Sequence, residues 1–235
     1  MRVACLGLGR MGWHIAGHLA DHSDAHDLAV FDVVDGLTGR WVEEHNGTEA
    51  DSVESAVTGA EFIVTSLPSD QELAEVATEV LPAIAEGAIW IDHSTTSAQI
   101  ACELGSGMSA VGGHFLDGPV SGGVDGARRG ALSVMVGGDE SAFARVEPLV
   151  QIYASRVRHM GPVGAGQLTK MTNQICVVGL CQALAEGLDF ASRAGLEVEN
   201  VVEAMLQGSS TSWQMENRAD KMLAGEYDFG FSTAL

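Results

Sequence analysis

The feature that most constrains the fold is a glycine motif near the amino terminus, Gly-Leu-Gly-Arg-Met-Gly at residues 7–12. A short apolar run at residues 2–6 precedes it, and an apolar helical pattern follows it. In such a strand–turn–helix unit the first glycine permits the turn, the second admits a pyrophosphate, and the third lets helix and strand pack closely. The predicted dinucleotide contacts are Gly7, Leu8, Gly9, Arg10, Met11 and Gly12.

A second apolar strand at residues 28–32 ends in Asp32. A carboxylate in this place accepts hydrogen bonds from the adenosine ribose and would repel a 2′-phosphate. Val33 and Val34 follow, so no arginine stands beside the acid to hold that phosphate. The sequence therefore predicts NAD as the cofactor, with NADP less favoured.

Further strands are predicted at residues 62–65 and 88–91, with a helix between them. Alternating strands and helices indicate an α/β fold with a doubly wound (Rossmann) parallel sheet, whose ligand crevice lies at the carboxyl ends of the strands. Leu67 and Pro68 follow one strand, and Asp92, His93 and Thr95 follow or end the other. Asp92 and His93 leave two interpretations open, namely acid–base chemistry or the ordering of their own loop, and the second is the commoner role.

A glycine-rich loop joins two predicted strands within residues 114–138. In it Ser121 is followed by Gly122 and Gly123, which together offer a hydroxyl group and accessible backbone N–H groups. Such a concave set of donors can hold a carboxylate, although a plain flexible turn is the alternative. A helix at residues 139–150 and a strand at residues 155–160 complete this region.

Residues 161–166 form a second glycine-rich turn, which runs into a long apolar segment carrying Lys170. Both the helix amino terminus and partial burial lower the pKa of a lysine there, which suits a general acid or base. The alternative is a solvated lysine, but the chain has only two lysines. Helical spacing places Asn173 and Gln174 on the same stripe as Lys170.

The apolar helical pattern continues to about Arg193, and residues 199–207 and 213–224 are predicted to form further helices. We therefore expect an all-α domain after the sheet domain, with the long helix as the bridge. The predicted domains are residues 1–160, which bind the dinucleotide, and residues 161–235, which are helical.

The formal net charge of −20 argues against nucleic acid or an anionic membrane as a partner. No apolar run approaches the ~18–20 residues that a membrane span needs, and the amino terminus lacks the pattern of a signal peptide, so we expect a cytoplasmic protein. The scattered cysteines lack metal-ligand spacing, and we expect no metal. The acidic balance would suit a high-salt cytoplasm, which we keep as a hypothesis.

With these residues in place, the chain resembles the β-hydroxyacid dehydrogenase family, which includes 3-hydroxyisobutyrate dehydrogenase and tartronate semialdehyde reductase and, more distantly, 6-phosphogluconate dehydrogenase. The resemblance rests on four ordered motifs and spans nearly the whole chain. These motifs are residues 7–12, 92–95, 117–123, and 164–166 leading to Lys170, Asn173 and Gln174.

The resemblance implies hydride transfer between a nicotinamide and the alcohol carbon of a small hydroxy acid, in a homo-oligomer such as a dimer or tetramer. The family's catalytic lysine falls on Lys170, and its substrate-orienting carboxamides fall on Asn173 and Gln174. The glutamine is similar to the tartronate semialdehyde reductase branch and leaves the identity of the acid open. The carboxylate loop falls on Ser121, Gly122 and Gly123, and Thr95 matches the residue beside the nicotinamide ribose.

The resemblance also implies that the family's helical domain continues beyond a point matching residues 229–235, so the sequence predicts a truncated helical domain. Two alternative functions follow. One is a dinucleotide-binding protein without turnover, and the other is an imine reductase of the same fold. Lys170 disfavours the imine reductase, because those enzymes usually carry another residue in its place.

Overall fold

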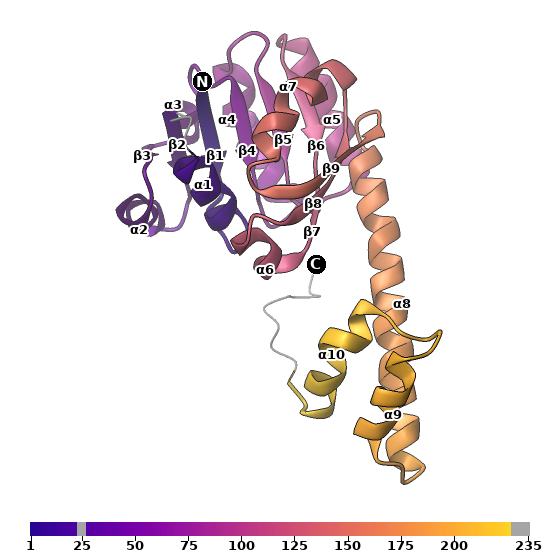
Figure 1. The fold of residues 1–235 in the computed structure, drawn as a ribbon. Helices are drawn as coiled ribbons and strands as arrows, with labels where there is room; N and C mark the ends of the chain where they lie inside the picture. The colour runs from indigo at the N-terminus through magenta and orange to yellow at the C-terminus, as the bar shows by residue number, and fades with distance from the viewer. Residues whose placement is uncertain (23–26, 227–235) are drawn as a thin grey trace. The chain divides into compact units, whose positions relative to one another are not determined.

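The computed structural model describes residues 1–22 and 27–226, which belong to two compact units, Met1–Lys170 and Met171–Leu235 (Figure 1). The first unit is an α/β sheet domain and the second is helical. Residues 229–235, on which the expectation of a truncated domain rests, lie outside the described residues.

The described part of the first unit contains a nine-stranded sheet in the order β3-β2-β1-β4-β5-β6-β8-β7, with β9 paired to β8. Strands β1 to β6 pair in parallel with one another, whereas β8 runs antiparallel to β6 and β7 and parallel to β9. The strands are β1 (Arg2–Leu6), β2 (Asp27–Phe31), β3 (Thr48–Glu49), β4 (Phe62–Thr65), β5 (Ile89–Asp92), β6 (His114–Asp117), β7 (Val120–Ser121), β8 (Leu132–Gly137) and β9 (Ala154–Gly161).

Helices cover both faces of this sheet. Alternate strand residues point to opposite faces, and both sets are apolar, so each face packs against its own helices. Val3 and Cys5 share one apolar core with helices α1 (Gly12–Asp21), α2 (Leu37–Glu44), α6 (Gly123–Arg128) and α7 (Glu140–Val150). Ala4 and Leu6 share the other with α3 (Val53–Val57), α4 (Asp70–Ala83) and α5 (Ala98–Ala110). The predicted doubly wound domain is confirmed.

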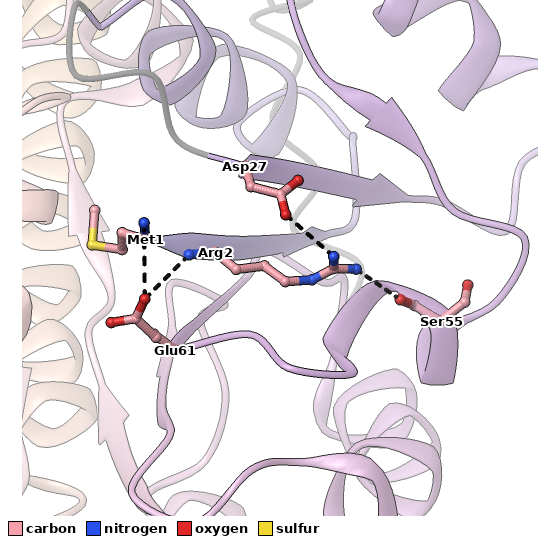
Figure 2. Close-up of polar contacts among 5 residues, drawn as sticks. All are labelled: Met1, Arg2, Asp27, Ser55 and Glu61. Carbon is pink, nitrogen blue, oxygen red and sulfur yellow. Dashed lines mark hydrogen bonds and ion pairs between the residues drawn. The ribbon is translucent and has the colours of Figure 1, made fainter.

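Arg2 ties together the amino ends of the strands, at the edge opposite the predicted crevice (Figure 2). Its guanidinium group donates to Asp27 Oδ2 and to the carbonyl oxygen of Ser55, both at 3.3 Å. Glu61 accepts from the Arg2 N–H at 3.4 Å and lies 3.9 Å from the Met1 ammonium group. These are exposed contacts, so we assign them a modest structural role.

The second unit consists, in its described part, of most of α8 (Ala165–Arg193) together with α9 (Val198–Leu206) and α10 (Trp213–Leu223). The small apolar core contains Leu184, Leu188, Val202 and Met215. The long helix predicted to start near residue 164 and to end near Arg193 is confirmed, and so is the helical character of the region after it.

Helix α8 is also long and apolar enough to cross a membrane, so the expectation that no stretch of the chain reaches that length and composition is wrong. Its exposed apolar side chains include Ile175, Val178 and Phe190. Length and composition alone are weak evidence for a span, since buried core helices of globular proteins can be as long and as apolar. The polar residues Gln167, Lys170 and Asn173 interrupt its first turns.

Candidate active site

The carboxyl ends of β1, β2, β4, β5 and β6 meet at one edge of the sheet, because these strands are parallel. The loops that follow these strands carry the residues of the first unit that are predicted to bind the dinucleotide and the substrate. Strand β7 pairs with β8 beyond the end of β6, which carries Ser121 to the same edge.

The glycine turn after β1 has the shape that a pyrophosphate requires. A Cβ atom on Gly12 would overlap the carbonyl oxygen of Gly7, and one on Gly7 would lie 2.5 Å from that of Ser66. A Cβ atom on Gly9 would meet nothing within 4 Å. The first and third glycines therefore permit close packing, and the second leaves open space in front of the backbone, which fits a dinucleotide phosphate. Leu8 is buried, while Arg10 is exposed and Met11 is half-buried beside this turn.

Asp32 is held against the same turn by its own carboxylate. Oδ2 accepts from the Leu8 N–H at 2.6 Å, and Oδ1 accepts from the Val34 N–H at 2.8 Å. Each oxygen keeps a further lone pair for a ribose hydroxyl group. Asp32 is itself half-buried, and the neighbouring Val33 is 86% exposed.

The loops after β4 and β5 are joined by a hydrogen bond from the Leu67 N–H to Ser94 Oγ at 2.8 Å. Pro68 and Thr95 are exposed in these loops, whereas Ser94 and Thr96 are buried. The buried residues thus hold the two segments together and leave Thr95 facing solvent.

The segment after β7 differs from the simple loop that the sequence predicts between two strands. Gly122 and Gly123 have φ angles of 128° and 61°, which few other residues adopt without strain, and they lead into the short helix α6. Ser121 is half-buried, and both glycines are exposed. The backbone therefore bends sharply here, with the hydroxyl and both glycines near the surface.

Asp117, at the end of β6, anchors the start of α8. Its Oδ1 accepts from the Gly164 N–H at 2.7 Å, and its Oδ2 accepts from the Gln167 N–H at 2.8 Å. The first N–H groups of a helix lack partners within the helix, and the Asp117 carboxylate accepts hydrogen bonds from two N–H groups at this end. Its negative charge also interacts favourably with the positive end of the helix dipole. Burial nevertheless raises the pKa of Asp117, and these hydrogen bonds oppose that rise.

The Gln167 side chain, which is fully buried, joins α8 to the loop after β5. Its Nε2 donates to the carbonyl oxygen of Ser94 at 2.8 Å, and its Oε1 accepts from the Thr96 N–H at 3.2 Å. Lys170 follows three residues later, which is nearly one helical turn. The carboxyl edge of the sheet therefore fixes the turn that carries Lys170.

Lys170 is half-buried, and burial lowers the pKa of its ammonium group. Asn173 and Gln174 are also half-buried, on the part of α8 that belongs to the second unit. Asn173 Nδ2 donates to Gln174 Oε1 at 3.1 Å. Met171, Thr172 and Ile175 are exposed, so burial along α8 follows the stripe that helical spacing predicts.

His93 is buried, and both of its ring nitrogens have hydrogen-bond partners within the fold. Its Nδ1 lies 2.5 Å from the carbonyl oxygen of Gly118, and its Nε2 lies 2.8 Å from the Tyr153 hydroxyl group. A carbonyl only accepts, so Nδ1 carries the proton and Nε2 accepts from the tyrosine. Burial lowers the pKa of His93 to about 4. Of the two open interpretations, the geometry favours loop ordering.

Asp92 is likewise turned inward. Its Oδ1 accepts from Thr65 Oγ1 and Ser94 Oγ, each at 2.6 Å, while Oδ2 has no hydrogen-bond partner among the described residues. Burial raises the pKa of Asp92 to about 6, and the charge of Asp117 acts in the same direction. The buried carboxyl group therefore stabilises the loop after β5 through its hydrogen bonds with Thr65 and Ser94.

The raised pKa of Asp92 predicts a specific pH dependence of stability. Well below pH 4 the carboxyl group is protonated in both folded and unfolded chains, and its stabilising contribution is complete. As pH rises from about 4 to about 6, only the unfolded chain ionises, so wild type should lose up to ~3 kcal/mol of unfolding free energy relative to Asp92→Asn. Urea denaturation of both proteins from pH 4 to 7.5 measures this difference. A constant difference would contradict it.

Among residues 1–22 and 27–226, no group of three or more histidine, cysteine or acidic side chains could hold a metal ion. Two anchoring residues escaped the sequence analysis as individuals. Asp117 entered only as the first residue of the motif at residues 117–123, and Gln167 was not identified as a candidate. A signal did exist for Gln167, because it lies on the same helical stripe as Lys170 and Gln174.

Two protein-family models together match nearly the whole chain. A family model described as the NAD binding domain of 6-phosphogluconate dehydrogenase matches residues 2–161. A second, described as NAD-binding of NADP-dependent 3-hydroxyisobutyrate dehydrogenase, matches residues 164–235. The boundary between the two matches falls in the glycine-rich turn before α8.

Individual relatives agree with these matches. An uncharacterized oxidoreductase of Shewanella frigidimarina is 44% identical over 234 residues, which are 98% of this chain and 80% of that protein. The 2-hydroxy-3-oxopropionate reductase of Escherichia coli is 35% identical over 241 residues, covering 100% of this chain and 80% of the enzyme. A Mycobacterium tuberculosis 3-hydroxyisobutyrate dehydrogenase solved with L-serine is 31% identical, with a TM-score of 0.87 over 93% of this chain and 74% of that one.

Proposed function

Because the chain belongs to the β-hydroxyacid dehydrogenase family, we propose that it transfers a hydride between NAD and the alcohol carbon of a small β-hydroxy acid. Family membership makes it an NAD(P)-dependent oxidoreductase. The preference for NAD and the kind of acid are the proposal. The acid is of the 3-hydroxyisobutyrate or tartronate semialdehyde type, which the names of the relatives support.

The observation that carries the proposal is the position of Lys170. This half-buried amine lies near the start of α8, on a helical turn that Gln167 and Asp117 hold to the carboxyl edge of the sheet. The glycine motif follows β1 at the same edge. In oxidation, neutral Lys170 takes the hydroxyl proton of the substrate, and in reduction its ammonium group returns a proton to the forming alkoxide. Because burial lowers the pKa of Lys170, the neutral amine forms at a lower pH than it would in an exposed lysine.

The remaining roles are assigned from position and residue chemistry. A bound nicotinamide dinucleotide supplies or accepts the hydride. Its pyrophosphate would lie on the turn at residues 7–12, and its adenosine ribose beside Asp32. Its nicotinamide end would lie near Leu67, Pro68 and Thr95. The hydroxyl group of Ser121 and the N–H groups of Gly122 and Gly123 would hold the substrate carboxylate, and Asn173 and Gln174 would orient the substrate.

Turnover with a panel of three- and four-carbon hydroxy acids, and with their oxidised forms, tests this function. Each compound is assayed with both nicotinamide cofactors and at several salt concentrations, after fluorescence titration has measured cofactor binding. Turnover of a small β-hydroxy acid is the expected result. Cofactor binding without turnover of any compound would instead support the alternative of a dinucleotide-binding protein.

NAD should be used better than NADP, because the carboxylate of Asp32 would face the extra phosphate. One uncompensated charge pair near a protein surface is worth a few kcal/mol, so we expect a ratio of kcat/KM values of at least ~10 in favour of NAD. Asp32→Asn should narrow this ratio, whereas Glu79→Gln, an exposed acid on α4, should not. A preference for NADP in wild type would contradict the assignment.

We further propose that the protein acts in the cytoplasm as a homo-oligomer. Light scattering after size-exclusion chromatography measures the oligomeric state. A monomer at assay concentration, with full activity, would contradict this part of the proposal.

A further inference from the structure

The Gln167 side chain binds the loop after β5 on both sides of Thr95. Its two hydrogen bonds reach the carbonyl oxygen of Ser94 and the N–H group of Thr96. The side chain is fully buried and both of these loop residues are buried, while Thr95 between them is exposed. One amide group therefore sets how far Thr95 lies from the first turn of α8.

The same residue is anchored a second time through its backbone. Its N–H group donates to Asp117 Oδ2, and this contact does not depend on the identity of the side chain. The start of α8 is thus held to β6 by the backbone and to the loop after β5 by the side chain. Of these two connections, the second joins the segments that carry Thr95 and Lys170.

We propose that Gln167 is a positioning residue for hydride transfer, which holds Lys170 and the Thr95 loop at a fixed separation. The inference rests on the proposed function, in which Lys170 exchanges the substrate proton and Thr95 lies by the nicotinamide. Proton and hydride transfer require the reacting groups to be aligned within fractions of an ångström. The amide donates through Nε2 and accepts through Oε1, and these two hydrogen bonds restrain the loop in a way that an apolar side chain of the same size does not.

Gln167→Met tests the proposal, because methionine has a similar length and leaves the backbone contact with Asp117 in place. We expect kcat to fall by ~10²-fold, the loss typical of a misplacement of about 1 Å. The deuterium isotope effect on kcat, measured with NADH deuterated at C4, should rise as hydride transfer becomes slower than the other steps. The dissociation constant for NADH should change much less than kcat. Hydrogen exchange at residues 94–97 should accelerate.

Val146→Ala serves as the matched control, because Val146 is fully buried in α7 on the apolar core and forms part of no proposed site. It should lower the melting temperature while leaving kcat per folded molecule and the isotope effect unchanged. Gln167→Asn, which keeps an amide but shortens the side chain, gives a second measurement if the methionine variant folds poorly. It should show the same larger isotope effect.

Unchanged kcat and isotope effect in both Gln167 variants, with only a lower melting temperature, would show that Gln167 acts on stability alone and would overturn the proposal. Failure of the proposed function looks different. In that case wild type itself would turn over no hydroxy acid, or Lys170→Met would remain fully active, and the positioning role would fall with it.

Discussion

Replacing Lys170 with methionine should reduce kcat by a factor of ~10²–10⁴, the usual loss when a positioned acid or base is removed. Methionine keeps much of the apolar stem and removes the amine. The binding of NAD should stay nearly unchanged, because the proposed cofactor contacts are the turn at residues 7–12, Asp32 and the strand-end loops. Steady-state kinetics and fluorescence titration of the cofactor measure the two effects separately.

The pH profile gives this prediction a second readout. Burial lowers the pKa of Lys170, so the neutral amine that oxidation needs becomes available at a lower pH than for an exposed lysine. The oxidative kcat of wild type should therefore rise through that pKa and then level off. In Lys170→Met this rise should disappear, because no group with that role remains.

Lys221 supplies the matched control, since it is the other lysine of the chain and lies on α10 with an exposed side chain. Lys221→Met makes the same chemical change and should leave kcat and its pH profile as in wild type. A Lys170→Met enzyme with near-normal kcat would show that the proton donor has been misassigned.

The elements that local sequence predicts well are those whose signals lie within a few residues. Such signals predict the turn after β1 from its glycine motif and β4 and β5 from their apolar runs. The acid after β2 is found in the same way. The long apolar pattern of α8 likewise fixed both of its ends. In contrast, β3 is only two residues long and α6 buries little, so neither has a period long enough to detect.

The anchors of the candidate site were beyond local reasoning for a different reason. Asp117 and Gln167 are 50 residues apart, and Gln167 lies 73 residues from Ser94, which it also binds. Which polar side chains become buried partners across such separations is decided by the packing of α8 on the sheet. The resemblance therefore pointed to Lys170, but only the structure shows what holds its helical turn in place.

Gly166 is the residue on which that packing depends most directly. A Cβ atom there would overlap the backbone carbonyl oxygens of Asp117 in β6 and Met135 in β8, and it would lie 2.8 Å from Asp117 Oδ2. These carbonyl groups belong to hydrogen-bonded strands and cannot turn aside as a flexible side chain can. The first turn of α8 therefore lies directly on the sheet only because this position has no side chain.

Gly166→Ala should accordingly destabilise the first unit at the upper end of, or beyond, the ~1–3 kcal/mol typical of overpacking. Any molecules that remain folded should lose activity as well, because the turn carrying Lys170 must move away from the strands. Helix propensity alone predicts the opposite sign, since alanine in a helix interior is favoured over glycine by ~0.5–1 kcal/mol. Steric overlap with the backbone should outweigh this preference.

Gly179→Ala separates the two effects within the same helix. A Cβ atom on Gly179 would meet nothing within 4 Å, so only helix propensity should act there. We expect this variant to be as stable as wild type or up to ~1 kcal/mol more stable. Urea denaturation of the two variants and wild type gives the comparison. If Gly166→Ala were as stable and as active as Gly179→Ala, α8 would not lie against β6 and β8 as described, and the anchoring of Lys170 to the sheet would have to be abandoned.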